Sequence, residues 1–140
     1  MPNNHSLKEP RSVIVKTFVA DKEPAKVLEF FLNVKNWEDG GVQRNISKAE
    51  GDWWNTESSF GKAKIRLRPS REFGIFDHDY AAPGREWTVY CRVTPNERGS
   101  TISFQFVRPE GMPKEEFEFQ LESSFESEME NLKKAIELLA

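Results

Sequence analysis

The stretch from residue 42 to residue 107 constrains the fold most, because its apolar side chains recur at every second position. A strand sends successive side chains to opposite faces, so this alternation predicts strands with one buried face. Turn-forming residues interrupt it about every ten residues, at Glu50-Gly51, 58–61, Pro69-Ser70, 82–84 and 95–99. The spacing predicts six antiparallel strands joined by short turns.

Further elements are predicted on both sides of this region. Residues 12–20 are rich in β-branched side chains, which favours a first strand. Residues 21–33 predict a helix with Asp21 as its N-cap, followed by a short helical turn over 34–39. Pro113 then opens a long helix whose apolar residues recur at steps of three and four. These residues are Phe117, Leu121, Phe125, Met129, Leu132, Ile136 and Leu139.

This order predicts an α+β protein with the helix-grip fold: a curved, seven-stranded antiparallel sheet wrapped around the long C-terminal helix. The apolar face of the sheet and the apolar stripe of the helix both need cover, and each supplies it to the other. We expect a single domain over residues 12–140, preceded by a flexible, polar N-terminal tail over residues 1–11.

The positions of the turns predict which side chains face the helix, since a slip of one residue would invert a strand. The predicted inner residues are Val42, Arg44, Ile46, Trp54, Thr56, Ala63, Ile65, Leu67, Phe76, His78, Trp87, Val89, Cys91, Val93, Ile102, Phe104 and Phe106. Most are apolar, and Arg44, Thr56, His78 and Cys91 are exceptions, with Glu72 a further candidate. A buried polar group costs about 1–3 kcal/mol without a partner. These groups therefore contact a ligand or satisfy one another.

His78 is the exception of greatest interest. It follows Asp77 on a predicted strand, so the two side chains must point to opposite faces, and we expect His78 inside and Asp77 outside. Two interpretations stay open for His78: a hydrogen-bonded core histidine or a ligand contact. Arg44 is either a rim charge that reaches solvent or a ligand contact. Trp54 and Trp87 belong either to the core or to the wall of a pocket.

The composition argues against several classes of function. Twenty Lys and Arg against 23 Asp and Glu give a net charge of -3, so no nucleic-acid partner is expected. The single cysteine, Cys91, excludes an intrachain disulfide and is expected to behave as a small apolar residue. Two histidines and one cysteine predict no metal site, and the glycine pattern predicts no phosphate-binding loop, so no cofactor is expected. The absence of an apolar run of roughly 20 residues and of a signal peptide predicts a cytoplasmic protein without membrane insertion.

A series of residues occurs in an order shared with a known superfamily: Trp53-Trp54, Thr56, Gly61, Arg66, Gly74, Asp77-His78, Arg92-Val93, Pro95-Asn96, Gly99-Ser100, Phe104, Arg108 and Gly111-Met112. In these residues the chain resembles the START and birch-pollen-allergen-like (SRPBCC) superfamily, and within it a bacterial, cofactor-free subgroup similar to polyketide cyclases and dehydrases. The resemblance implies a hydrophobic cavity between sheet and helix. Arg66, Asp77 and Arg92 are expected on the outer face, in a charge network across the strands.

We therefore expect the protein to bind a small hydrophobic or aromatic molecule, such as a lipid, in this cavity. The predicted ligand-binding residues are Arg44, Trp54, Thr56, Phe76, His78, Trp87, Cys91, Phe104 and Phe125. Whether the protein is an enzyme stays open; in a cyclase- or dehydratase-type acid–base reaction, His78 would be the catalytic residue.

An alternative is a non-enzymatic interaction module similar to chaperone-ATPase activators, with a partner on the outer sheet face or on the acidic side of the long helix. A monomer and a homodimer are both compatible with the sequence. An enclosed space of roughly 300 Å³ or more favours the ligand, and a filled core favours docking.

Overall fold

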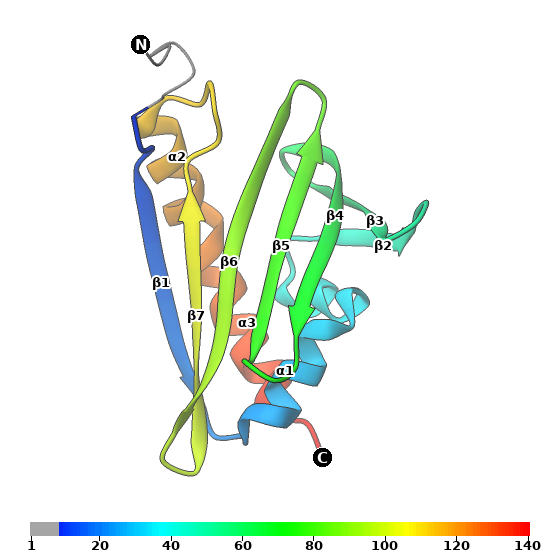
Figure 1. Cartoon of the computed structure of the whole chain (residues 1–140), viewed down its shortest axis with the longest axis vertical. Helices are drawn as coiled ribbons and strands as arrows, with labels where there is room; N and C mark the ends of the chain where they lie inside the picture. Colours follow the sequence, from blue (N-terminus) through cyan, green and yellow to red (C-terminus); the bar gives the residue numbers. More distant parts are fainter. Residues whose placement is uncertain (1–8) are drawn as a thin grey trace, which may run out of the picture.

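The computed structural model describes residues 9–140 as one curved antiparallel sheet that wraps around a long C-terminal helix (Figure 1). The seven strands lie in the order β1-β7-β6-β5-β4-β3-β2. Their bounds are β1 (Val13–Ala20), β2 (Arg44–Lys48), β3 (Trp53–Ser58), β4 (Gly61–Ser70), β5 (Ile75–Ala82), β6 (Arg85–Asn96) and β7 (Gly99–Val107). The predicted fold class is confirmed. The tail predicted over residues 1–11 lies mostly outside the described residues.

The C-terminal helix runs behind the sheet in the view of Figure 1. It consists of α2 (Lys114–Gln120), a π-helical turn η3 (Leu121–Phe125) and α3 (Glu126–Glu137). The predicted stripe faces the sheet, with Leu121 and Leu139 partly buried and Phe117, Phe125, Met129, Leu132 and Ile136 buried. The spacing of apolar residues therefore predicted correctly which side of the helix is covered.

Helix α1 (Pro24–Leu32) and the 3-10 helix η2 (Val34–Gly40) follow β1. The predicted N-cap of α1, Asp21, is wrong: Glu23 holds that position, and the Asp21 carboxylate pairs with Arg98 at 3.0 Å. Proline at the first helical position needs no hydrogen-bond partner for its nitrogen, so the helix begins at Pro24 rather than near Asp21.

Strand pairing confirms the predicted faces even where it differs in register. Trp54 lies opposite Ile65, and His78 lies opposite Val89. The turn between β4 and β5 falls after Ser70 rather than at Pro69-Ser70. As a result, the residue opposite Leu67 is His78, whereas a turn at Pro69-Ser70 would place Glu72 there. Since this slip covers an even number of residues, the paired side chains of β4 and β5 keep their predicted faces.

The inward placement of Arg44 is wrong. A β-bulge interrupts the pairing of β2 with β3 between Arg44 and Ser47, and Asn45 has a φ of 54°. The extra residue of a bulge breaks the alternation, so Arg44 no longer shares a face with the buried Ile46. Arg44 is exposed opposite Glu57, and Glu72, also expected inside, is exposed in the turn between β4 and β5.

The core is most densely filled at the end of the sheet where α1 lies. Val27, Phe76, Ile102 and Ile136 are 0% exposed there, and the Phe31 ring stacks on Phe76 with 4.3 Å between centroids. Helix α1 lies at the other end of the sheet from α2 and from the turn between β5 and β6 (Figure 1). A cavity lies at the end where α2 and that turn lie.

Phe125 tests the packing of the helix against the sheet. Its ring is 6% exposed and contacts the rings of Phe104 and Phe106 at centroid distances of 5.1 and 4.5 Å. Phe125→Ala is expected to lower the free energy of unfolding by about 3–5 kcal/mol in denaturant melts. The control is Phe119→Ala, because Phe119 is 68% exposed on the same helix and its loss should cost little. Equal, small effects of both substitutions would contradict the packing.

Candidate functional site

A cavity of about 600 Å³ lies between the sheet and the first half of the C-terminal helix. The turns that precede β4 and β6 border it, and the partly or fully exposed Lys62 and Arg85 mark its solvent-facing rim. Most of the wall is apolar and includes Val42, Ala63, Tyr80, Trp87, Val89, Phe106, Met112, Phe117, Leu121 and Phe125. Its volume falls within the ~300–1,000 Å³ that small-molecule sites occupy.

A chain of hydrogen bonds runs along one side of the cavity. The buried Thr56 hydroxyl on β3 donates to Gln43 Oε1 at 2.6 Å, and Gln43 Nε2 donates to the Tyr80 hydroxyl at 3.5 Å. The Tyr80 ring on β5 stacks on Trp87 of β6, with centroids 5.0 Å apart and planes 11° apart. These contacts fix the direction of the Tyr80 side chain.

Glu128 of α3 is the acidic group of the cavity wall. Its carboxyl group has no hydrogen bond or ion pair with any residue in the described part of the chain. It keeps some accessible surface because it lines the cavity, but surrounding atoms shield it from bulk water, and this burial raises the pKa of Glu128 to about 7. Burial also raises the pKa of Tyr80, and the charge of Glu128 raises it further.

Glycine at position 40 makes room for Glu128. A β-carbon on Gly40 would lie 2.8 Å from Cγ and 3.3 Å from Oε2 of Glu128. The carbonyl of Gly40 accepts a hydrogen bond from Asn131 Nδ2 at 3.0 Å, which ties the end of η2 to α3. The inward position of Glu128 therefore depends on a helix–helix contact and not on the side chain alone.

His78 is buried, as expected, while the neighbouring Asp77 points to the other face. The His78 ring lies next to the Trp37 ring, with centroids 4.5 Å apart, and its Nδ1 is 3.0 Å from the carbonyl oxygen of Phe76. Burial lowers the pKa of His78 to about 4, so the ring is neutral near pH 7, which accords with Nδ1–H donating to that carbonyl. The ring borders a separate space of about 50 Å³, which it shares with Tyr80 and Glu128.

Cys91 and His78 do not form a nucleophilic pair. Sγ of Cys91 lies 3.9 Å from Nδ1 of His78. However, burial raises the pKa of the Cys91 thiol and lowers that of His78, so both groups favour their neutral forms. Cys91 is a small buried apolar residue, as the sequence predicted.

The structure divides the predicted ligand-binding residues into three groups. Thr56, Trp87 and Phe125 line the large cavity. Phe76, His78 and Phe104 line the small space, together with Phe125. Arg44, Trp54 and Cys91 line neither of these two spaces.

Sequence reasoning missed Gln43, Tyr80 and Glu128. The sequence holds a signal for Glu128: Gln120, Ser124 and Glu128 follow one another at steps of four and lead to Leu132 in the apolar stripe. All three polar residues line the cavity. A polar row on the edge of an apolar stripe thus marks the part of the helix that faces a hollow rather than solvent.

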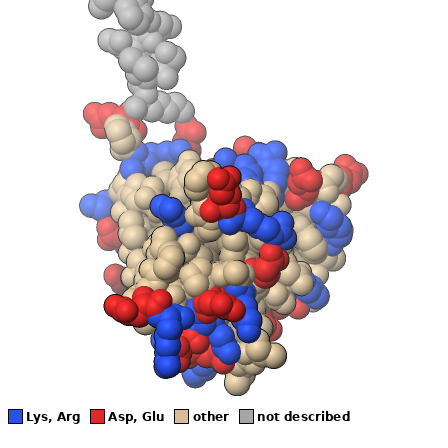
Figure 2. Space-filling model, turned by 60° about the horizontal axis from the view of Figure 1, so that its bottom comes forward, with Lys and Arg blue, Asp and Glu red and all other residues tan. Residues whose placement is uncertain are grey.

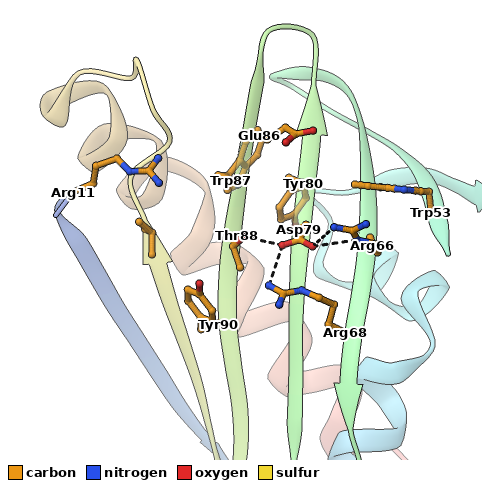
Figure 3. A pocket seen from close by; sticks show the side chains of 11 residues that line it. Arg11, Trp53, Arg66, Arg68, Asp79, Tyr80, Glu86, Trp87, Thr88 and Tyr90 are labelled. Atoms are coloured by element: carbon orange, nitrogen blue, oxygen red, sulfur yellow. Dashed lines mark hydrogen bonds and ion pairs between the residues drawn. The ribbon is translucent and has the colours of Figure 1, made fainter. Parts of the chain in front are cut away.

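A second depression, of about 500 Å³, lies on the outer face of the sheet (Figure 3). Its centre is Asp79, which Arg66 and Arg68 contact at 3.0 and 3.1 Å and to which the Thr88 hydroxyl donates at 2.7 Å. Burial by itself raises the pKa of Asp79, but the hydrogen bond from Thr88 and the two arginines lower it below its usual value. The Arg66 guanidinium also lies over the ring of Trp53, 4.8 Å from its centroid.

The predicted outer charge network is therefore present but has a different centre. Asp77 accepts the backbone N–H of Cys91 at 2.7 Å, and Arg92 donates to the carbonyl of Phe73 at 3.2 Å. In the view of Figure 2, Lys and Arg side chains are interspersed with Asp and Glu.

Among residues 9–140, no cluster of three or more His, Cys, Asp or Glu side chains is arranged to hold a metal, and no helix is long and apolar enough to cross a membrane.

The protonation of Glu128 predicts how stability depends on pH. The folded protein binds this proton more tightly than an ordinary carboxylate with a pKa of 4.5, so stability falls as pH rises through about 7. Glu128→Gln removes this ionisation. The variant is expected to gain on the order of 3 kcal/mol relative to the wild type between about pH 4.5 and about pH 8.5, measured by denaturant melts.

Glu122→Gln is the matched control, because Glu122 is exposed on the same helix. The comparison with the wild type cancels the opposite contribution of His78, whose lowered pKa makes stability fall as pH drops from 6.5 through about 4. A stability difference that does not change with pH would show that Glu128 is not shielded from water.

No protein-family model matches the sequence, and no curated protein matches it. Solved structures do match the fold. XoxI from Bacillus cereus is 12% identical with a TM-score of 0.72, over 89% of this chain and 95% of that one. The Aha1 dimer from Colwellia psychrerythraea is 13% identical with a TM-score of 0.72, over 91% and 97%. Ara h 8.0201 is 10% identical with a TM-score of 0.66, over 89% and 97%.

At such low identities the likeness concerns the fold alone. Each match covers nearly the whole length of the similar structure and most of this chain. The sheet and its long helix are therefore matched together. The chain thus has the helix-grip fold: a curved antiparallel sheet wrapped around a long C-terminal helix.

Proposed function

We propose that the protein binds a small hydrophobic or aromatic molecule in the cavity between the sheet and the C-terminal helix. The observation that carries the proposal is the space of about 600 Å³, walled mainly by aromatic and aliphatic side chains and containing the unpaired Glu128. A filled core would have favoured docking alone. An apolar ligand gains free energy by leaving water, and few polar groups suffice to orient it.

An acid–base reaction of the cyclase or dehydratase type is the enzymatic form of this proposal. A general acid or base works best with a pKa near the working pH. Glu128, with a pKa of about 7, meets this condition better than His78, with a pKa of about 4. In this proposal Glu128 exchanges the proton, and His78, which borders the adjoining small space, contributes its ring as a wall and Nε2 as a polar atom, since Nδ1 is bonded to the carbonyl of Phe76.

The alternative is a partner that docks on the outer face of the sheet. The depression around Asp79 is large enough to be considered, and Arg11, Arg66 and Arg68 line it. However, Arg66 and Arg68 both contact Asp79, so one of their two positive charges is compensated inside the protein. The carboxyl group in the cavity has no such partner, and we therefore prefer the ligand. Since one similar structure is a dimer, a homodimer is proposed alongside a monomer.

Filling the cavity tests this function. Ser124 lines the cavity from η3, whereas its neighbour Ser123 is exposed on the other side of the helix. Ser124→Phe should place a ring in the cavity and weaken the binding of 1-methylnaphthalene, a neutral aromatic probe, at least about tenfold. Equilibrium dialysis measures this affinity.

Ser123→Phe is the control, because it adds the same ring outside the cavity. Its affinity for the probe should equal that of the wild type. Equal affinities of all three proteins, or no binding by the wild type, would contradict a ligand site in this cavity.

A further inference from the structure

Three polar side chains of the cavity wall, Thr56, Gln43 and Ser124, donate hydrogen bonds within the protein. Thr56 donates to Gln43, and Gln43 donates to the Tyr80 hydroxyl. The Ser124 hydroxyl donates to the carbonyl of Gln120 at 2.8 Å. The phenolic O–H of Tyr80 is the last donor in this series of hydrogen bonds, and no described residue accepts a hydrogen bond from it.

Acceptors remain on the opposite side. The two oxygens of Glu128 receive no hydrogen bond from any described residue. Tyr80 and Glu128 line the same two spaces, yet they are not hydrogen-bonded to each other. One free donor and one free acceptor therefore border a common hollow.

Both groups are held in place by other residues. Tyr80 is stacked on Trp87, and Glu128 lies against Gly40, whose carbonyl is bonded to Asn131. Side chains held in this way favour one position of a bound polar atom. They also lose little conformational freedom when a ligand binds, which lowers the cost of binding.

The polar groups that a ligand could carry differ in how well they can hydrogen-bond to both Tyr80 and Glu128. A hydroxyl donates one hydrogen bond and accepts others, so it can satisfy Glu128 and Tyr80 together. An ammonium group only donates, and it would pass Lys62 and Arg85 at the rim. A carboxylate only accepts, and it would meet the like charge of Glu128. A purely apolar ligand would leave both groups without partners.

We propose that the ligand is an alcohol or phenol whose hydroxyl group lies between Glu128 and Tyr80, donating to the carboxylate and accepting from the phenol. The rest of the molecule is apolar and fills the space along Trp87, Phe106 and Phe125. This inference rests on the proposed function, since it names the class of ligand for the same cavity.

Three probes with one ring system test the inference at about pH 8, where Glu128 is mostly ionised: 1-naphthol, 1-methylnaphthalene and 1-naphthylmethylamine. The measured quantity is the ratio of the dissociation constant of 1-methylnaphthalene to that of 1-naphthol. Glu128→Met should lower this ratio about 10- to 100-fold, since it removes a charged acceptor, and Tyr80→Phe should lower it several-fold. Glu122→Met, on the exposed side of the same helix, should leave it unchanged.

The outcomes separate this inference from the function on which it rests. If 1-methylnaphthalene binds and the ratio is the same in wild type and Glu128→Met, the cavity is a ligand site but the hydroxyl assignment is wrong. Tightest binding of the amine by the wild type would also overturn the assignment, in favour of a cationic ligand. If neither neutral probe binds, the proposed function fails and this inference fails with it.

Discussion

The contact between the apolar stripe of the C-terminal helix and the concave face of the sheet is the constraint on which the rest of the structure depends. Along α3, this contact is completed by rings and aliphatic chains from α1, among them Phe31 and Val27. Along α2 and η3, no other helix within residues 9–140 packs between the two surfaces, and a cavity lies there. The same packing that makes one end of the domain solid therefore leaves the other end hollow.

The faces of the strands could be predicted from the sequence because they depend on parity alone. The hairpin from β4 to β5 shows this: the turn was placed too early, yet Leu67 and His78 lie on the predicted face. The predicted face of Arg44 is wrong because a bulge shifts the alternation of inward and outward side chains by one residue. No residue pattern near Arg44 indicates that bulge. Alternation thus predicts burial reliably only where the ladder of hydrogen bonds is continuous.

The site was harder to predict than the fold. Trp87 and Phe125, two of the predicted ligand-binding residues, line the cavity, and His78 is buried, but the sequence interpretation assigned the acidic residues of the helix to solvent. The position of Glu128 also depends on η2, where a β-carbon on Gly40 would crowd Cγ of Glu128 at 2.8 Å. The row of Gln120, Ser124 and Glu128 at steps of four hints at the cavity, but the contact with Gly40 joins segments far apart in the chain and leaves no local pattern.

The central claim is that the cavity holds a small molecule, and native mass spectrometry tests it most directly. The protein would be purified from the organism that produces it and measured before and after denaturation. The account predicts a native mass that exceeds the chain mass of 16.2 kDa, or twice that mass for a dimer, by that of one small molecule per chain, which denaturation releases. A native mass equal to that of the bare chain or its dimer, with a second protein co-purifying in fixed proportion, would contradict it and favour docking.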